Sequence, residues 1–81
     1  MASTQQDVQS WIKKTIDSND VVLFMKGHRH EPQCGFSAKM VGMLDILLSD
    51  YLHINVLDHP EIREGIKEYT NWPTIPQLFV N

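Results

Sequence analysis

The chain has 81 residues, with ten acidic and seven basic side chains and a formal net charge of −3. This length predicts a single domain over residues 1–81, and the acidic balance argues against nucleic acid as a partner. The longest apolar run, Val21–Met25, is too short to cross a membrane. Since the one cysteine, Cys34, cannot form an internal disulfide, a reducing compartment is indicated.

The first half of the chain predicts two helices and a strand. Apolar residues recur at helical spacing over roughly residues 4–18, which indicates an amphipathic helix. Val21–Met25 is continuously apolar rather than alternating, as is typical of a strand covered on both faces. We expect a polar loop over residues 27–35, followed by a second helix over about residues 36–49.

The second half predicts a strand, a helix and a last strand. Apolar and polar residues alternate over residues 52–56, which indicates the strand. Asp58 is expected to cap the start of a third helix, with a proline in its first turn, and Asn71 can cap its end. Residues 72–76 form a proline-containing connector before Gln77–Val80. This order predicts an α/β layer fold whose first two strands are parallel.

Cys34 is the candidate for chemistry. It stands where the polar loop meets the second helix, and unpaired backbone N–H groups and the helix dipole favour negative charge there. The pKa of its thiol is therefore expected below the free-cysteine value, and Lys26 could add to the effect. The neighbours of Cys34 are polar or small, which favours a reactive thiol over a buried inert one.

Ser37 stands where a Cys-x-x-Cys motif would carry its second sulfur. Without a resolving thiol, dithiol exchange within the chain is impossible, so a second thiol must come from a small molecule or another chain. The Ser37 hydroxyl can donate to a thiolate, but it cannot release a mixed disulfide. An ordinary first-turn helix residue is an equally good interpretation of Ser37.

Several uncommon motifs follow one another along the chain: Lys26-Gly27, Pro-Gln-Cys-Gly-Phe-Ser at 32–37, Asn-Val-Leu at 55–57, Glu-Ile-Arg-Glu-Gly-Ile-Lys at 61–67, and Trp-Pro-Thr-Ile-Pro at 72–76. Together they resemble the monothiol glutaredoxin family of the Cys-Gly-Phe-Ser type, and the resemblance covers nearly all of residues 20–80. It implies a thioredoxin-like (glutaredoxin) three-layer α/β/α fold. It also implies a cis peptide between Ile75 and Pro76, which the sequence alone would not indicate.

The resemblance further implies a glutathione site beside Cys34. The glutathione-binding residues carried over by position are Lys26, Gly35, Phe36, Arg63, Lys67, Thr74, Ile75 and Pro76. The three cations would hold the carboxylates, and the backbone of Thr74 and Ile75 would pair with the tripeptide. A local basic cluster suits an anionic ligand on an acidic protein. By pattern alone, Arg63 and Lys67 are instead typical of a solvated helix face.

The family's main role is to bind and transfer a [2Fe–2S] cluster, which takes four thiolates. Cys34 of two chains and two glutathione thiols would supply them, implying a homodimer with the cluster and a monomer without it. Soft, exposed thiolates are suitable ligands. We therefore expect a carrier that serves iron–sulfur acceptor or assembly proteins and redox homeostasis, in a bacterial cytoplasm or an organelle matrix. The alternative is a glutathione-dependent thiol–disulfide oxidoreductase using Cys34, at most a weak enzyme.

Two departures from the family stand out. His28-Arg29, with His30 beyond, replaces the usual Thr or Ser followed by Pro. A Zn²⁺ site formed with Cys34 is one interpretation of these histidines, and solvated loop histidines are the favoured interpretation. Family domains also continue with another strand and a closing helix, so the domain is expected to be C-terminally incomplete. Gln77–Val80 would then be an exposed apolar edge, reflecting either a truncated chain or strand-paired assemblies.

Overall fold

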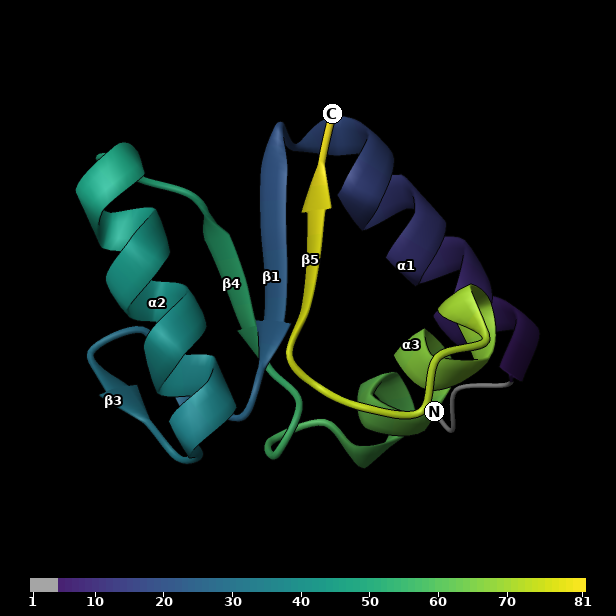
Figure 1. Cartoon of the computed structure of the whole chain (residues 1–81). Helices are drawn as coiled ribbons and strands as arrows, with labels where there is room; N and C mark the ends of the chain where they lie inside the picture. The colour runs from purple at the N-terminus through teal and green to yellow at the C-terminus, as the bar shows by residue number, and fades with distance from the viewer. Residues whose placement is uncertain (1–4) are drawn as a thin grey trace.

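The computed structural model describes residues 5–81, and it places a three-stranded sheet between two layers of helices (Figure 1). Helices α1 (Gln5–Ser18) and α3 (Pro60–Thr70) cover one face of the sheet, and α2 (Gly35–Leu47) covers the other. The predicted three-layer fold is confirmed. The predicted start of the first helix at residue 4 lies outside the described residues.

Strand β1 (Val21–Met25) is the centre of the sheet, whose order is β4-β1-β5. It pairs in parallel with β4 (Leu52–Asn55) and antiparallel with β5 (Gln77–Val80). The parallel pairing confirms the prediction from the helical crossover between the two strands. Four of the five β1 residues are fully buried, as the continuous apolar run predicts.

Alternating side chains of β1 divide the core between the two faces of the sheet. Val22 and Phe24 pack towards α1 and α3, and the Phe24 ring meets Phe79 edge-on with centroids 5.7 Å apart. Leu23 and Met25 pack towards α2. Because both faces of β1 are covered, this strand fixes the position of the segment that follows it, where the thiol loop begins.

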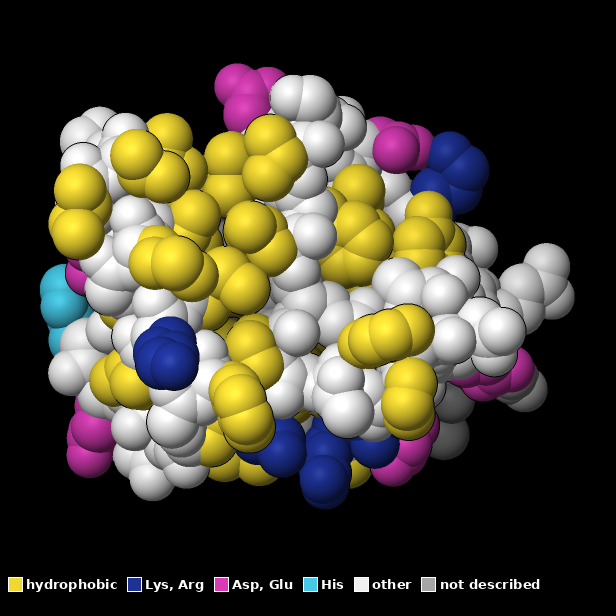
Figure 2. Space-filling model, in the orientation of Figure 1, with side chains coloured by type: hydrophobic (Ala, Val, Ile, Leu, Met, Phe, Trp, Pro, Cys, Tyr) yellow, Lys and Arg dark blue, Asp and Glu magenta, His cyan; other side chains and the backbone are white. Residues whose placement is uncertain are grey.

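Apolar side chains also gather on the surface over α2 and beside β5 (Figure 2). Ile46, Leu47 and Val80 are 85%, 76% and 66% exposed. Within residues 5–81, no strand pairs with the outer edge of β5, so the expected edge is unpaired, although Val80 is its only exposed side chain, since Leu78 and Phe79 are half-buried against the core. Self-association through this edge stays a prediction.

Two local predictions are wrong. Residues 27–35 are not simply a loop, because β2 (Gly27–His28) and β3 (Glu31–Pro32) form a short antiparallel hairpin. Two-residue strands are too short to show alternation in a sequence. Asp58 is also not the cap of α3: proline favours the first helical position, so His59 takes the capping place before Pro60, without a side-chain hydrogen bond.

None of the helices in the described part of the chain has the length and apolar character that a bilayer crossing requires. The end of α3 is set by Asn71, which adopts a left-handed conformation with φ 55°. This residue turns the chain into the connector of residues 72–76, which runs back towards the sheet (Figure 1).

Candidate functional site

Cys34 is the N-cap of α2. Its backbone is extended, with φ −149° and ψ 156°, and its Sγ accepts a hydrogen bond from the Ser37 N–H at 3.3 Å. The sulfur thus occupies the place of the oxygen that a serine or aspartate supplies at other helix starts. Because the first backbone N–H groups of a helix have no partner within it, they favour a thiolate over a neutral thiol.

The pKa of the Cys34 thiol lies below its ordinary value. Partial burial of the sulfur acts in the opposite direction and raises the pKa. Hydrogen bonds from the Ser37 side chain and from the backbone at Ser37 and Phe36, together with the charge of Lys26, outweigh that effect. The predicted lowering is therefore confirmed in direction, and its sources include both the helix start and Lys26.

Ser37 links the thiol to the end of β1. Its side chain is fully buried, and its Oγ accepts a hydrogen bond from the Lys26 N–H at 3.1 Å. The same Oγ lies 3.2 Å from Cys34 Sγ. When the sulfur carries the proton it donates to Ser37, and when the sulfur is ionised the hydroxyl proton can face it. Ser37 is therefore a positioning residue for the thiol as well as a first-turn residue of α2.

Ser37→Ala is expected to raise the pKa of Cys34 and to slow its alkylation by iodoacetamide at neutral pH about fivefold. A hydrogen bond of this kind contributes on the order of 1 kcal/mol, and its loss leaves less thiolate at any pH below the pKa. The measurement is the alkylation rate against pH. Lys26→Gln is the comparison variant, and it should raise the midpoint less, because the Lys26 charge is the smallest contribution. An unchanged midpoint in Ser37→Ala would contradict the assignment.

A cavity of about 610 Å³ lies between α2, α3 and the connector. Its walls are Lys26, Phe36, Lys39, Met40, Met43, Arg63, Lys67, Pro73, Thr74, Ile75 and Pro76. Seven of the eight residues predicted for glutathione are among them, and Gly35 is not. Cys34 is not a wall residue either, but its sulfur is near enough to Lys26 for that charge to act on its pKa.

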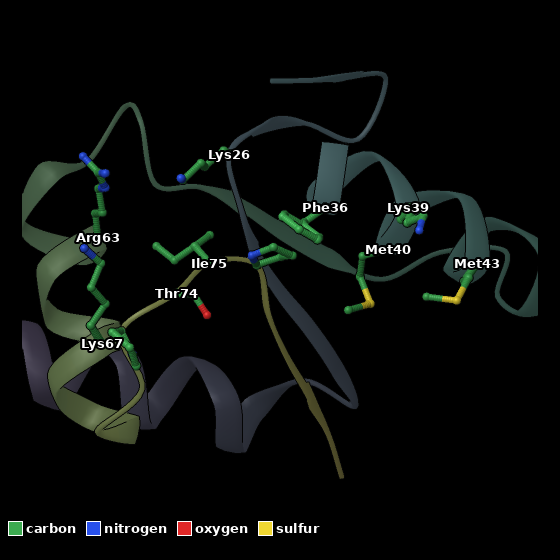
Figure 3. Close-up of a pocket in the computed structure, with 11 residues that line it drawn as sticks. Lys26, Phe36, Lys39, Met40, Met43, Arg63, Lys67, Thr74 and Ile75 are labelled. Carbon is green, nitrogen blue, oxygen red and sulfur yellow. The ribbon is translucent and has the colours of Figure 1, made fainter. Parts of the chain in front are cut away.

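Figure 3 shows how separate elements build this cavity, which we call the cationic pocket. Arg63 and Lys67 project from α3 on one side, and Lys26 lies to the right of Arg63, directly after the end of β1. Phe36 and Met40 come from α2 on the other side, with Ile75 of the connector between the two groups. The chain therefore brings together side chains that are up to 50 positions apart in its 81 residues, from Lys26 to Pro76.

The charge of this pocket is opposite to that of the whole protein. Four cations and no carboxylate line it. Lys67 approaches Glu64 at 3.6 Å, whereas Lys26 and Arg63 make no ion pair within residues 5–81. Uncompensated cations around a cavity favour an anionic ligand, and Arg63 offers paired donors for a carboxylate.

The connector is held by a residue that the sequence pattern did not mark as functional. Gln77 is buried, and its Nε2 donates to the carbonyls of Trp72 and Thr74 at 3.1 and 3.0 Å. Its Oε1 lies 2.9 Å from the Thr70 hydroxyl. Gln77 thereby fixes the pocket wall, in which the predicted cis peptide between Ile75 and Pro76 is confirmed. The sequence feature that could have indicated this role is that Gln77 is the only polar residue of the otherwise apolar strand β5.

Four further wall residues were missed: Lys39, Met40, Met43 and Pro73. The first three lie three, four and seven positions after Phe36 on α2, which is the spacing of one helix face. The cationic pocket therefore has an apolar arm along α2, with a lysine beside it. Helical spacing from Phe36 was the signal that could have found this arm.

The histidines before Cys34 do not form the alternative zinc site. Within residues 5–81, no three metal-binding side chains are placed to hold a metal ion. Arg29 between them instead braces the hairpin: its Nε donates to Asp45 at 2.8 Å, and its guanidinium lies 4.5 Å from the centre of the Tyr51 ring. This departure from the family motif thus has a structural explanation at Arg29.

A thiol at the start of a helix whose next residues line a pocket together with a proline-containing connector, on an α/β/α scaffold, defines a protein of the thioredoxin-like class. The sequence profile of the glutaredoxin family matches residues 21–81, and the chain belongs to that family. Its Cys-Gly-Phe-Ser sequence and its relatives place it among the monothiol members.

One relative is an uncharacterized monothiol glutaredoxin of Porphyra purpurea, 46% identical over 70 residues, covering 86% of this chain and 65% of the relative. Another is the mitochondrial monothiol glutaredoxin-5 of Saccharomyces cerevisiae, 47% identical, covering 93% of this chain and 52% of the relative. Thus the chain spans between about half and two thirds of the length of these relatives. The solution structure of a monomeric truncated mutant of Trypanosoma brucei 1-C-Grx1 superimposes with a TM-score of 0.76 at 41% identity, over 99% of this chain and 69% of that one.

Proposed function

We propose that residues 1–81 act as one monothiol glutaredoxin domain that binds glutathione in the cationic pocket and carries a labile [2Fe–2S] cluster between two subunits. The observation that carries this proposal is the pairing of one thiol of lowered pKa with an adjacent pocket of uncompensated cations. The chain has no second cysteine, so it depends on an outside thiol for either cluster binding or exchange.

Glutathione fits the chemistry of this pocket. It is an anionic tripeptide with two carboxylates, which Lys26, Arg63 and Lys67 can hold. Its peptide groups need backbone partners, and within residues 5–81 the Ile75 N–H has no hydrogen-bond acceptor. Thr74 and Pro76 complete that wall, and Phe36, 75% exposed, offers an apolar surface close to the thiol. Gly35 does not line the pocket, so in this proposal it has no contact with glutathione and only links Cys34 to Phe36.

The cluster is cargo that one chain cannot hold alone. A [2Fe–2S] cluster takes four thiolate ligands, and each chain supplies only Cys34. Two chains and two glutathione thiols complete the set, so the proposed cluster-bound form is a homodimer. Cys34 is half-buried at the start of α2, so its sulfur can reach a shared ligand. A cluster held in this way is readily given up to an acceptor or assembly protein.

Anaerobic reconstitution with iron, sulfide and glutathione tests the proposal. The wild-type chain is expected to gain the visible absorption of a [2Fe–2S] cluster and to elute as a dimer. Cys34→Ser should gain neither, since the two Cys34 thiolates are half of the four cluster ligands and the only ones that the protein supplies. Omitting glutathione should abolish the spectrum in the same way. A cluster spectrum that survives in Cys34→Ser would overturn the ligand assignment.

A second candidate function is a glutathione-dependent oxidoreductase, which the lowered pKa of Cys34 favours because the thiolate is the nucleophile. The thiolate would attack the glutathione sulfur of a mixed disulfide, releasing the substrate as its thiolate and leaving glutathione bound to Cys34. A second glutathione thiolate would then attack that bond, freeing Cys34 and forming glutathione disulfide. Brisk turnover of a glutathionylated substrate would favour the enzyme, and slow turnover with cluster uptake would favour the carrier.

We propose a reducing compartment for either activity, either a bacterial cytoplasm or the matrix of an organelle. A lone thiol of lowered pKa keeps its free form only where oxidants are scarce. The mitochondrial yeast relative supports an organelle as one such place.

A further inference from the structure

A second cavity, of about 590 Å³, shares no wall residue with the cationic pocket. It lies between α1, β2, β4 and the start of α3, and we call it the acidic groove. Among the charged, aromatic and imidazole-bearing residues that line it are Asp58, Glu61, Trp11, His28, His53 and His59. None of these six residues has a part in the glutathione or cluster chemistry proposed above.

The charge of the acidic groove is opposite to that of the cationic pocket. It is lined by three carboxylates and by no lysine or arginine. Asp58 and Glu61 each face an imidazole, His28 and His59, at 3.8 Å, which is beyond hydrogen-bond distance. Their side chains are 61% and 47% exposed, so their oxygens are open to a donor from outside. The groove therefore suits a cation.

Trp11 adds a flat surface to these carboxylates. It belongs to α1, whose Val8 and Ile12 are buried in the core, yet Trp11 itself is 44% exposed at the groove. A guanidinium group can stack on an indole face while donating paired hydrogen bonds to a carboxylate, which an ammonium group does less well. An arginine side chain thus matches the groove better than a lysine.

The groove also runs along β4, an edge strand of the sheet. Within residues 5–81 no strand of that sheet pairs with its outer edge, although the hairpin of β2 and β3 contacts β4 and the Gly27 N–H donates to the Asn55 side chain at its end. A partner segment would therefore align along the part of β4 that the hairpin leaves uncovered. We propose that the acidic groove docks an extended segment of a partner protein through an arginine side chain of that segment. This site is separate from the glutathione site, and its partner need not carry a thiol or a cluster.

The test uses the full chain with Trp72→Phe, which leaves Trp11 as the only tryptophan. The probe is the peptide acetyl-Val-Arg-Val-amide, and the comparison peptide has citrulline, uncharged and of the same shape, in place of arginine. Trp11 fluorescence is expected to change saturably as the arginine peptide is added. The citrulline peptide should bind at least about tenfold more weakly than the arginine peptide, and raised salt should weaken binding of the arginine peptide by a similar factor. Saturating glutathione should not compete.

A matched pair of variants locates the effect. Asp58→Asn with Glu61→Gln should weaken binding of the arginine peptide at least about tenfold. Asp20→Asn with Glu31→Gln removes two charges outside the groove and should leave binding unchanged. Equal binding of both peptides, or full binding by the groove variant, would overturn the proposal. Loss of the fluorescence change on adding a chelator would also overturn the proposal, because it would indicate a bound metal ion. So would a groove variant that changes the self-association of the chain but not its binding of the peptide. None of these results would affect the glutathione site.

Discussion

Phe24→Ala is expected to destabilise the fold by about 3–5 kcal/mol, the usual loss when a buried phenylalanine is truncated. Phe24 is fully buried in the central strand, and its ring packs edge-on against Phe79 at 5.7 Å, a contact that adds to the burial of its area. A chain of 81 residues has a total stability of roughly 4–12 kcal/mol, so this loss removes a large part of it.

Phe36→Ala is the matched control for Phe24→Ala, because the same atoms are removed from a side chain that is 75% exposed. Its free energy of unfolding in urea should stay within about 0.5 kcal/mol of wild type. The two variants therefore separate burial from the chemical change itself. Equal losses of stability in both would show that the core packing between the sheet and α1 and α3 is not what the structure describes.

Gly27→Ala is the second large expected effect, with a loss of at least about 2 kcal/mol. Gly27 has φ +91°, and an added Cβ would lie 2.6 Å from both the Gln33 nitrogen and the Glu31 oxygen. Both are backbone atoms, so the hairpin itself has to move. Since Gln33 directly precedes Cys34, we also expect a changed rate of Cys34 alkylation.

The opposite sign is expected for Gly42→Ala. Gly42 lies within α2, and a Cβ there meets nothing within 4 Å. Alanine should therefore stabilise the helix by about 0.5–1 kcal/mol and leave the thiol unchanged. Urea unfolding and alkylation rates measure both variants. A Gly27→Ala chain as stable as wild type would contradict the tight turn.

The layers of the fold could be predicted because they depend on patterns of apolar residues and on the order of elements, both of which can be seen in the sequence. A continuous apolar run marks β1 as buried on both faces, and a helix between two strands makes them parallel. The hairpin before Cys34 left no such pattern, since its strands have two residues each. Its existence depends instead on the positive φ of Gly27 and on the hydrogen bond from Gly27 N–H to the Asn55 side chain.

The site could be predicted only in part for the same reason. The position of Cys34 at a helix start follows from local order along the chain, and so does the direction of its pKa shift. That Arg63 and Lys67 face a pocket rather than solvent depends on how α3 packs beside the connector, which spacing does not show. The part played by Gln77 depends on carbonyls three and five residues before it, which only the folded connector presents.

Arg29 has a mechanical consequence for the whole of α2. The hairpin of β2 and β3 leads directly into Cys34 at the first turn of this helix. Its Arg29 side chain also donates hydrogen bonds to Asp45 in the last turn of α2 and to Asp50 just beyond the helix. Helix and hairpin are therefore joined near both ends of α2, and the segment that leads into Cys34 is held at two places, by the chain itself and by the guanidinium of Arg29.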